Sequence, residues 1–512
     1  MLVSRKHRKL VLKLKNPERV TTVIPTAKRF DYKGTELVAV PHRLDETRVL
    51  RNLGFAAPSP IKYHYDWSGQ YQPFFAQRET ADFLTINPKA FVLNDLGTGK
   101  TLSVLWTFDY LRQMGLAKKM LIVSPLSTLE HTWADEVFRH FPHLTTGVLY
   151  GTKERRLKML KEDVDIYLVN HDGIKVIQDE LIARTDIDTI TVDEIASFRN
   201  GSSGRWKSLN KICAGRERVW GLTGTPTPNL PTDAWAQCRL IAPERIPPYF
   251  GKFREAVMKQ FGPFKWLPRE GATEIVAAAM QPAVRFTREE CVDLPPCIYL
   301  DRTVALSKEQ ADAYRTMQAK LKMEFEEQQV TAVNEAVKLQ KLIQIACGVV
   351  YDSEGNDVIL PNDPRVAVVR EVIEEAGTKV IVFVPFKGVL RHVAEQLSKD
   401  FSVAVVSGDT PTAERREIFR DFQKARDPRV LVAQPAAMSH GLTLTAASTI
   451  IWYAPITSNE VYQQANGRIT RPGQKHTQFI VNIEATPVER RIYDRLKNKQ
   501  SLQGLLLSTV KG

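Results

Sequence analysis

The sequence has 512 residues, enough for three or four domains with large hydrophobic cores. Hydrophobic residues make up 43% and charged residues 25%, which is typical of a soluble globular protein. No apolar run is long enough to cross a membrane and no signal segment opens the sequence, so we expect a cytoplasmic protein without a membrane partner.

Cysteine and histidine spacing gives little support for a metal centre. The five cysteines are scattered and form no C-x-x-C pair, which argues against a zinc ribbon or a disulfide framework and favours a reducing compartment. His131, His140 and His143 come closest to a metal cluster, but core or surface histidines explain that spacing better.

The net charge is +13, from 71 basic and 58 acidic residues, and it favours a polyanionic partner such as nucleic acid. Residues 1–66 hold 14 Lys and Arg against 6 Asp and Glu, so 8 of the 13 excess charges lie in this short segment. A solvated basic surface with no partner is the alternative interpretation.

The first 66 residues are expected to form a small, basic, β-rich accessory domain. Leu10, Leu12 and Leu14 alternate with Val11 and lysines, which is the periodicity of a strand with one buried face. The predicted elements are strands at 10–14, 20–24 and 37–40, a helix at 44–53 and a linker at 56–60.

Strands and helices alternate from residue 77 onward, which predicts a parallel sheet covered on both faces. Ligands of such sheets collect at the carboxyl ends of the strands. The predicted strands are 89–93, 119–123, 146–149, 165–169, 188–192 and 217–222, with amphipathic helices such as 129–140 between them.

A glycine-rich loop follows the first of these strands and opens a helix at 102–114. Its two glycines let backbone N–H groups turn toward an anion, and the helix N-terminus adds a favourable dipole. Lys100 would reach the β- and γ-phosphates of a nucleoside triphosphate, and the Thr101 hydroxyl would hold Mg²⁺.

The strict motif G-x-x-x-x-G-K-[ST] requires glycine where this chain has Asn94. A chance glycine-rich turn is the alternative. The predicted phosphate-binding residues are Gly97, Thr98, Gly99, Lys100 and Thr101.

Two adjacent carboxylates, Asp193 and Glu194, end the strand at 188–192. Downstream of a phosphate loop, this pair is expected to serve hydrolysis. Asp193 would hold Mg²⁺, and Glu194 would orient or deprotonate the attacking water. An isolated Asp-Glu pair is more often structural.

The region after residue 242 interrupts the alternation. Residues 243–300, rich in proline, aromatic and basic residues, are interpreted as connecting, and residues 306–347 as helical. A second alternating block follows and lacks a glycine loop of its own. Its predicted strands are 379–384, 403–406, 429–433, 449–453 and 478–483, and its helices are 366–376, 388–400, 412–423, 458–466 and 487–499.

Two arginines in the second block, Arg468 and Arg471, are three residues apart and are predicted to share one helical face. They could both approach a γ-phosphate and offset the charge that develops in phosphoryl transfer. A surface pair of arginines is the alternative interpretation.

These motifs, taken in order, resemble those of the superfamily 2 helicases and translocases, and among them the Swi/Snf-type DNA translocases in a compact phage or bacterial form. The resemblance covers residues 70–500. The matching segments are Gln77, the loop 95–101, Ser124 to Leu129 with Trp133, Thr223-Gly224-Thr225-Pro226 with Asn229, Ser439 to Leu444, and Gln464 to Gln474.

The resemblance implies roles for these residues. Gln77 would read adenine, and Thr223, Thr225 and Gln464 would couple hydrolysis to movement. Arg468 and Arg471 would act on the γ-phosphate from a second lobe. The residues implied in nucleic-acid binding are Ser124, Ser127, Thr128 and Gly441.

Some features depart from the family pattern. The usual D-E-A-H or D-E-G-H sequence reads Asp193 to Ala196 here, so the histidine that often links two motifs is absent. The large insertions of eukaryotic remodelers are missing, and residues 1–66 match no family motif.

We therefore expect an α/β protein with two tandem RecA-like parallel-sheet lobes and a small basic β-rich N-terminal domain. Its expected activity is ATP- and Mg²⁺-dependent movement on duplex or branched DNA in a bacterial or phage-infected cell. A strand-separating DNA or RNA helicase, a non-stepping ATP-dependent binding switch and a small-molecule kinase are the alternatives. The predicted domains are 1–66 for substrate recognition, 67–242 for the first lobe, 243–350 as a helical connection and 351–512 for the second lobe.

Overall fold

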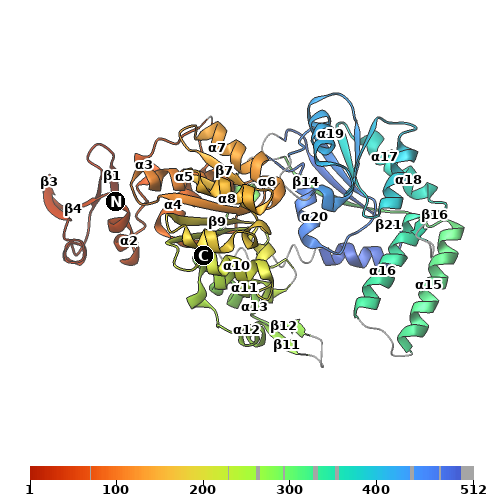
Figure 1. Cartoon of the computed structure of the whole chain (residues 1–512), viewed down its shortest axis with the longest axis horizontal. Coiled ribbons are helices and arrows are strands. Elements are labelled where there is room, and N and C mark those ends of the chain that lie inside the picture. Colours follow the sequence, from red (N-terminus) through yellow and green to blue (C-terminus); the bar gives the residue numbers. More distant parts are fainter. Residues whose placement is uncertain are drawn as a thin grey trace. The chain divides into compact units, whose positions relative to one another are not determined.

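The computed structural model describes residues 1–512 except 70, 229, 261–265, 292–294, 327–331, 352–356, 439–442, 472–473 and 497–512. The chain divides into two compact units, one built on Met1–Cys291 and the other on Val292–Leu502. Each unit is described by itself (Figure 1). Within the described residues, no helix is long and apolar enough to cross a membrane.

The N-terminal part of the first unit is an antiparallel sheet of order β1-β2-β4-β3. Its core contains Leu10, Leu12, Val38 and Val40 from the sheet. The strands are β1 (Leu2–Ser4), β2 (Lys9–Leu12), β3 (Lys28–Tyr32) and β4 (Thr35–Pro41), and the helices are α1 (Glu18–Thr21) and α2 (Leu44–Asn52).

The strand predicted at 20–24 is wrong, because the helix α1 and a turn occupy this segment. Val20 and Ile24 are four residues apart, so a helical turn places both side chains on one face, and both are buried in the N-terminal core. Apolar residues spaced by four fit a helical turn as well as a strand when the segment is this short.

The segment 56–60, predicted to be a linker, packs against the rest of the first unit, and its residues Ala57 and Ser59 are buried. The segment packs against α4 (Phe75–Ile86), whose buried Asp82 accepts hydrogen bonds from Arg51 Nη2 at 2.5 Å and from the Ser59 N–H at 2.6 Å. Leu44 of α2, Ile61 of α3 (Ile61–His64) and Tyr65 belong to the core that covers the large sheet of this unit. The N-terminal sheet is therefore fastened to the same body as that sheet.

A seven-stranded sheet of order β13-β5-β10-β9-β6-β8-β7 forms the centre of the first unit, and all its pairings are parallel. The six strands expected from the sequence are present. They are β5 (Lys89–Val92), β6 (Lys119–Ser124), β7 (Thr146–Leu149), β8 (Ile166–Asn170), β9 (Ile187–Asp193) and β10 (Arg218–Leu222).

Helices cover both faces of this sheet. One face carries α4, α5 (Lys100–Gln113) and α7 (Asp135–His140), which follows a π-helical turn at Leu129–Ala134. The other face carries α8 (Lys153–Lys161), α9 (Gln178–Ala183), α10 (Gly204–Cys213), α11 (Ala234–Ile241), α12 (Phe250–Val257) and α13 (Ala272–Ala279).

The region 243–300, expected only to connect, contributes strands to both units. The short strand β13 (Ala283–Val284) pairs with β5 in the first unit, and β14 (Cys297–Thr303) pairs with β21 in the second. The hairpin of β11 (Met258–Gln260) and β12 (Trp266–Pro268) and the helix α14 (Arg288–Cys291) also lie in this region.

The second unit is a parallel sheet of order β14-β21-β20-β17-β19-β18, with apolar cores on both faces. Its other strands are β17 (Lys379–Phe383), β18 (Val403–Val406), β19 (Val430–Ala433), β20 (Ala447–Trp452) and β21 (Gln478–Glu484). Its helices are α15 (Lys308–Glu326), α16 (Ala332–Cys347), α17 (Asp363–Glu375), α18 (Lys387–Leu397), α19 (Thr412–Lys424), α20 (Asn459–Asn466) and a segment at 487–496, and β15 (Val349–Tyr351) and β16 (Asp357–Ile359) form a hairpin.

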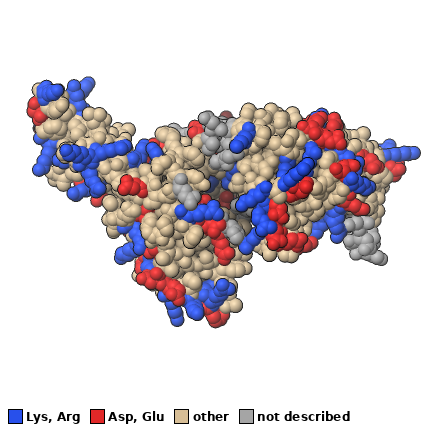
Figure 2. Space-filling view, turned by 90° about the horizontal axis from the view of Figure 1, so that it is seen from above, with Lys and Arg blue, Asp and Glu red and all other residues tan. Residues whose placement is uncertain are grey.

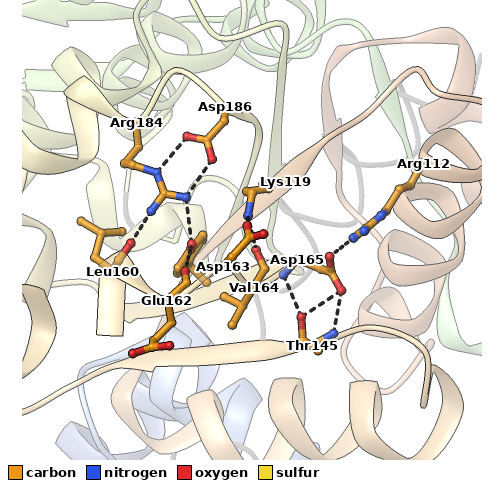
Figure 3. Close-up of polar contacts among 11 residues, drawn as sticks. Arg112, Lys119, Thr145, Leu160, Glu162, Asp163, Val164, Asp165, Arg184 and Asp186 are labelled. Carbon is orange, nitrogen blue, oxygen red and sulfur yellow. Dashed lines mark hydrogen bonds and ion pairs between the residues drawn. The ribbon is translucent and has the colours of Figure 1, made fainter. Parts of the chain in front are cut away.

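Ion pairs brace the amino edge of the first unit's large sheet (Figure 3). Arg184 forms two hydrogen bonds of 2.8 Å with Asp186, just before β9. Asp165, just before β8, pairs with Arg112 and accepts hydrogen bonds from the Thr145 N–H and hydroxyl at 2.8 and 2.9 Å. Burial would raise the pKa of Asp165, but these hydrogen bonds and the guanidinium lower it below its ordinary value. Ligands of parallel sheets collect at the opposite, carboxyl edge.

Candidate functional site

The glycine-rich loop lies between β5 and α5, as the sequence predicts. Gly97 and Gly99 have φ values of 84° and 76°, a left-handed conformation that other residues adopt at a cost. A Cβ atom on Gly99 would also lie 2.1 Å from Nε2 of Gln77, so the Gln77 side chain would have to move away from the loop. Glycine is therefore favoured at 99 by the backbone conformation, and it leaves room for the contact with Gln77.

Lys100, the first residue of α5, directs its side chain back over the loop. Its Nζ donates hydrogen bonds to the carbonyls of Asn94 at 2.8 Å and Asp95 at 3.0 Å, and the Thr98 hydroxyl donates to the Asp95 carbonyl at 2.8 Å. Thr101 follows in the first turn of the helix and is half-buried. A cation, a helix N-terminus and a glycine turn thus meet at one place, which is the arrangement that binds phosphates.

Asn94 has a structural role that a glycine could not fill. Its side chain is buried, Nδ2 donates to the Thr80 hydroxyl of α4 at 2.9 Å, and Oδ1 accepts from the Phe286 N–H at 2.9 Å. The departure from the strict loop motif thus fastens the loop to α4 and to the segment after β13.

Arg285 is a site residue that sequence reasoning did not single out. Its Nη2 lies 3.1 Å from Oδ1 of Asp95 in an ion pair with a buried guanidinium, and the Asp95 N–H donates to the Phe286 carbonyl at 3.0 Å. The two partners are 190 residues apart, and only the pairing of β13 with β5 brings them together. No local motif marks this residue.

Gln77 lies against the loop from α4. Its Nε2 donates to the Gly99 carbonyl at 3.2 Å and its Oε1 accepts from the Phe74 N–H at 2.9 Å, with the side chain buried. These contacts brace the loop at the start of α5.

Asp193 ends β9 on the same sheet edge, and Trp133 holds its carboxylate. The indole Nε1 donates to Oδ2 of Asp193 at 3.0 Å, and the Glu194 N–H donates to Oδ1 at 3.1 Å. Burial raises the pKa of Asp193, while the hydrogen bond from Trp133 and the positive charge of Lys100 act in the opposite direction. Trp133 therefore orients a carboxylate that the sequence assigned to the metal.

Glu194 has a left-handed backbone, with φ 50° and ψ 52°. A non-glycine residue in this region carries a strain of about 1–3 kcal/mol and is enriched at functional sites. The Thr223 hydroxyl lies 3.4 Å from its Oε2, and the Thr225 N–H donates to the Thr223 hydroxyl at 3.1 Å. Glu194 is thus connected directly to the segment that follows β10.

The position of the absent histidine is occupied by the buried Ala196. Near it, His171 packs its ring against Phe198, with ring centroids 5.0 Å apart, and its Nε2 lies 2.9 Å from the Asp193 carbonyl. The two motifs that a histidine would link are here joined through Thr223 and Glu194.

The side chains expected to bind nucleic acid are not equally accessible. Ser124 and Thr128 are buried, and their hydroxyls donate to the Pro125 carbonyl at 3.4 and 3.0 Å. Ser127 is exposed on the short helix α6 (Leu126–Thr128). Gly441 lies outside the described residues.

The prediction that Arg468 and Arg471 share a helical face is wrong, because α20 ends at Asn466 and both arginines lie in the turns that follow. Gly467, a poor helix former, is the C-terminal cap residue. Arg468 is buried and its carbonyl accepts from the Leu444 N–H at 3.0 Å, whereas Arg471 is half-buried and donates from Nε to the Gly467 carbonyl at 3.0 Å. Gln464 is buried on α20 itself.

The first unit therefore brings together Gln77, the loop 97–101, Asp193, Glu194 and the threonines 223 and 225. The Thr223 N–H donates to the Val92 carbonyl at 3.1 Å, which places the segment after β10 beside the loop after β5. Gln464, Arg468 and Arg471 belong to the second unit.

Comparison with known proteins identifies two family models along the chain. The SNF2-related domain matches residues 84–347, and the Helicase conserved C-terminal domain matches residues 364–473.

Individual proteins are also similar to this chain. Protein p41 of Acyrthosiphon pisum secondary endosymbiont phage 1 is 27% identical over 440 residues, which are 81% of this chain and 94% of that protein. An ATP-dependent helicase of Mycoplasma pneumoniae is 25% identical over 80% of this chain but only 39% of its own length, so this chain spans about two fifths of that relative. The solved SWI2/SNF2 ATPase core of Sulfolobus solfataricus in complex with dsDNA is 22% identical, with a TM-score of 0.40 over 86% of this chain and 94% of that one.

Proposed function

This chain belongs to the SNF2-related family of ATP-dependent helicases and translocases, and on that premise we propose that it couples ATP hydrolysis to movement along duplex or branched DNA. One observation carries the proposal. Thr223 contacts Glu194 and also Val92, the last residue of the strand before the phosphate loop, so these motifs meet at one edge of a parallel sheet, and a second parallel-sheet unit carries Arg468 and Arg471.

Lys100 and the amides of the loop 97–101 hold the triphosphate of ATP, with Gln77 next to the start of α5. Thr101 and Asp193 offer a hydroxyl and a carboxylate, which are the hard oxygen ligands that suit Mg²⁺. The bound Mg²⁺ would supply positive charge at the phosphates. Trp133 keeps the Asp193 carboxylate oriented for this role.

Glu194 orients or deprotonates the attacking water, and its strained backbone fixes the direction of its side chain. Because Thr223 contacts Glu194, a change in the position or charge of this carboxylate during hydrolysis also moves the segment 223–225. This segment couples hydrolysis to movement. Arg468 and Arg471 offset the negative charge that develops on the γ-phosphate, as arginine fingers do.

Phosphate contacts supply the grip on DNA. The net charge of +13 and the exposed Ser127 support binding through the DNA backbone. The affinity should then fall steeply with salt, because binding releases counterions from the phosphates. The fit with a phage protein and a bacterial helicase supports a role inside a bacterial or phage-infected cell.

The test is the ATPase rate measured with single-stranded, duplex, forked and four-way DNA and with RNA. We expect stimulation by duplex-containing DNA, and loss of activity in Lys100→Ala and Glu194→Gln. Lys118→Ala, which removes an exposed lysine at the amino edge of the sheet, is the matched control and should retain wild-type activity. Stimulation by RNA alone would contradict the proposal.

A further inference from the structure

The N-terminal sheet has one face packed on helices and one face open to solvent. Directly paired residues of antiparallel strands point to the same face, so the register assigns each side chain to a face. Leu10 pairs with Val40 and Leu12 with Val38, and all four are buried with residues of α1 and α2. The alternate residues form the other face, which we call the open face. Its side chains include the exposed Lys9, Lys28, Phe30 and Tyr32, the half-buried Val11 and Leu37, and the buried Ala39.

Two aromatic rings lie exposed on the open face. Phe30 is 38% exposed and Tyr32 is 59% exposed, and both stand on β3, an edge strand whose five residues are all exposed. Residues two apart on a strand are neighbours on one face, so the two rings lie on the same face of the sheet. Nζ of Lys33 lies 5.6 Å from the centroid of the Tyr32 ring.

The two faces differ in charge. Within the four strands, all of which the structure describes, the open face carries Lys9 and Lys28 and no carboxylate. Asp31 and Glu36 occupy opposite positions of the strand register on the helix-packed face, which also carries Arg29, with its Nη1 3.7 Å from Oε1 of Glu36. Figure 2 shows Lys and Arg gathered around this sheet, at the left of the view. The open face therefore presents aromatic rings bordered by positive charge.

We propose that the open face binds unpaired bases of DNA, with Phe30 and Tyr32 stacking on the bases and Lys9, Lys28 and Lys33 contacting the neighbouring phosphates. The assignment rests on the proposed function as a DNA-dependent motor and names the part of the substrate that the N-terminal domain selects. Aromatic stacking suits any base, because every base has a π-face, and cationic side chains follow the backbone.

Unpaired bases fit this surface better than a duplex does. In a duplex the base faces are covered by their neighbours, so two exposed rings on a flat sheet would have no partner to stack on. Aromatic residues on the open face of a four-stranded sheet are a general means of binding splayed, single-stranded bases. Forked and branched DNA, which combine a duplex with unpaired segments, would engage both the motor and this face.

Hydrogen bonds connect the N-terminal domain, through α4, to the glycine-rich loop. The helix α2 of the N-terminal domain is held to α4 through Arg51 and Asp82, and Gln77 at the other end of α4 contacts Gly99. A strand bound on the open face is therefore attached to the same body that binds ATP.

The test compares ring removal with ring exchange. The variant Phe30→Ile with Tyr32→Ile keeps apolar, β-favouring side chains but removes both rings, and Phe30→Tyr with Tyr32→Phe keeps them. Phe138→Ile with Tyr249→Ile removes two exposed rings elsewhere in the same unit, at 81% and 71% exposure, and is the matched control. Equilibrium binding is measured to forked DNA, blunt duplex, a single strand and a single strand with abasic sites, which keeps the phosphates without the bases.

We expect the isoleucine pair at 30 and 32 to lose about tenfold or more in affinity for forked and single-stranded DNA, with blunt duplex and abasic strand unchanged. The ring-exchange and control variants should bind as the wild type. Equal binding of normal and abasic strands by the wild type would overturn the inference, and so would unchanged binding by the isoleucine pair. If the wild type forms a dimer that the isoleucine double variant disrupts while DNA binding stays intact, the open face would instead bind a second copy of this protein. The failure of the motor proposal can be told apart from the failure of the open-face proposal by the ATPase rate of the wild type with duplex DNA. If duplex DNA does not stimulate the ATPase, the motor proposal is contradicted. If it does, the binding data test the open face alone.

Discussion

At the scale of single residues, the carboxylate of Asp193 is oriented by an indole and not by a charged partner. Trp133 is fully buried, so its N–H must either meet this carboxylate or lose a hydrogen bond in the core. Such a contact sets the direction of the oxygens without neutralising them, which would leave the negative charge available to the proposed Mg²⁺.

Trp133→Phe removes this donor and keeps most of the aromatic volume. We expect the ATPase kcat to fall by about 10- to 100-fold, because the ligand loses its orientation. The variant should need a higher Mg²⁺ concentration for half-maximal ATPase activity. Its unfolding temperature should change little compared with its loss of activity. Full activity at ordinary Mg²⁺ would contradict the role assigned to Trp133.

Asn94→Gly would restore the strict loop motif, yet we expect it to be harmful. The substitution removes two hydrogen bonds, because the Thr80 hydroxyl loses a donor while keeping its own bond to the Ala76 carbonyl, and the half-buried Phe286 N–H loses its acceptor. At about 0.5–1.5 kcal/mol for each hydrogen bond, urea unfolding should show destabilisation of about 1–3 kcal/mol. Wild-type stability of the glycine variant would show that these bonds contribute little.

At the scale of elements, two polar links hold segments that are distant in the sequence. In the first unit, Nδ1 of His42 lies 2.9 Å from Nε2 of His64, and Nε2 of His42 lies 2.8 Å from the Pro58 carbonyl, which joins β4 to α3. In the second unit, Arg365 of α17 makes two hydrogen bonds, of 2.8 and 3.0 Å, with Glu489 of the helix 487–496, and both side chains are buried.

The histidine link predicts a pH-dependent stability. Burial lowers the pKa of His42, and burial with the nearby charges of His42, Arg8 and Arg5 lowers that of His64, each below the ordinary value of 6.5. The unfolded chain then binds protons more readily, so this stability is present above pH 6.5 and is lost as the pH falls below it. Thermal unfolding from pH 8 to pH 5.5 should show this loss, and His42→Gln with His64→Gln should make it smaller, with the remainder due to His140 and His392, whose pKa values burial also lowers. An equal slope in both proteins would contradict the assignment.

The buried ion pair predicts a contrast between single and double variants. Arg365→Ala leaves Glu489 buried without its partner and should destabilise the protein by about 3–5 kcal/mol. Replacing both, with Arg365→Met and Glu489→Leu, removes the buried charges together and should cost far less than the single change. Chemical unfolding of the three proteins, followed by a probe of the second unit, measures this difference. Equal losses in the single and double variants would show that packing, rather than charge, holds the two helices together.

The regular strands were predictable because each is a run of apolar residues between turns, and the phosphate loop because its glycines and lysine are contiguous. The strands β13 and β14 were not, since β13 has two residues and both lie in a region without alternation. The strand predicted at 20–24 was wrong because apolar residues spaced by four also fit a helical turn. Contacts such as Arg285 with Asp95 depend on sheet pairing across 190 residues, which no local pattern contains.

At the scale of the whole molecule, two parallel-sheet units carry complementary sets of motifs. The first unit holds the glycine-rich loop proposed to bind the nucleotide, the carboxylates proposed for hydrolysis and the N-terminal open face, and the second holds the arginines. The N-terminal domain packs into the core of the first unit through Leu44, Ile61 and Tyr65, so deleting residues 1–66 would expose that core. Point variants on the open face therefore test its role more cleanly than a truncation does.

The central claim, that ATP hydrolysis moves this protein along DNA, is tested most directly by displacement of a third strand from triplex DNA. We expect the wild type to release the third strand with ATP, without separating the underlying duplex, and Lys100→Ala and Glu194→Gln to release none. ATP-dependent DNA binding with no release of the third strand would contradict the claim and identify a binding switch that does not step.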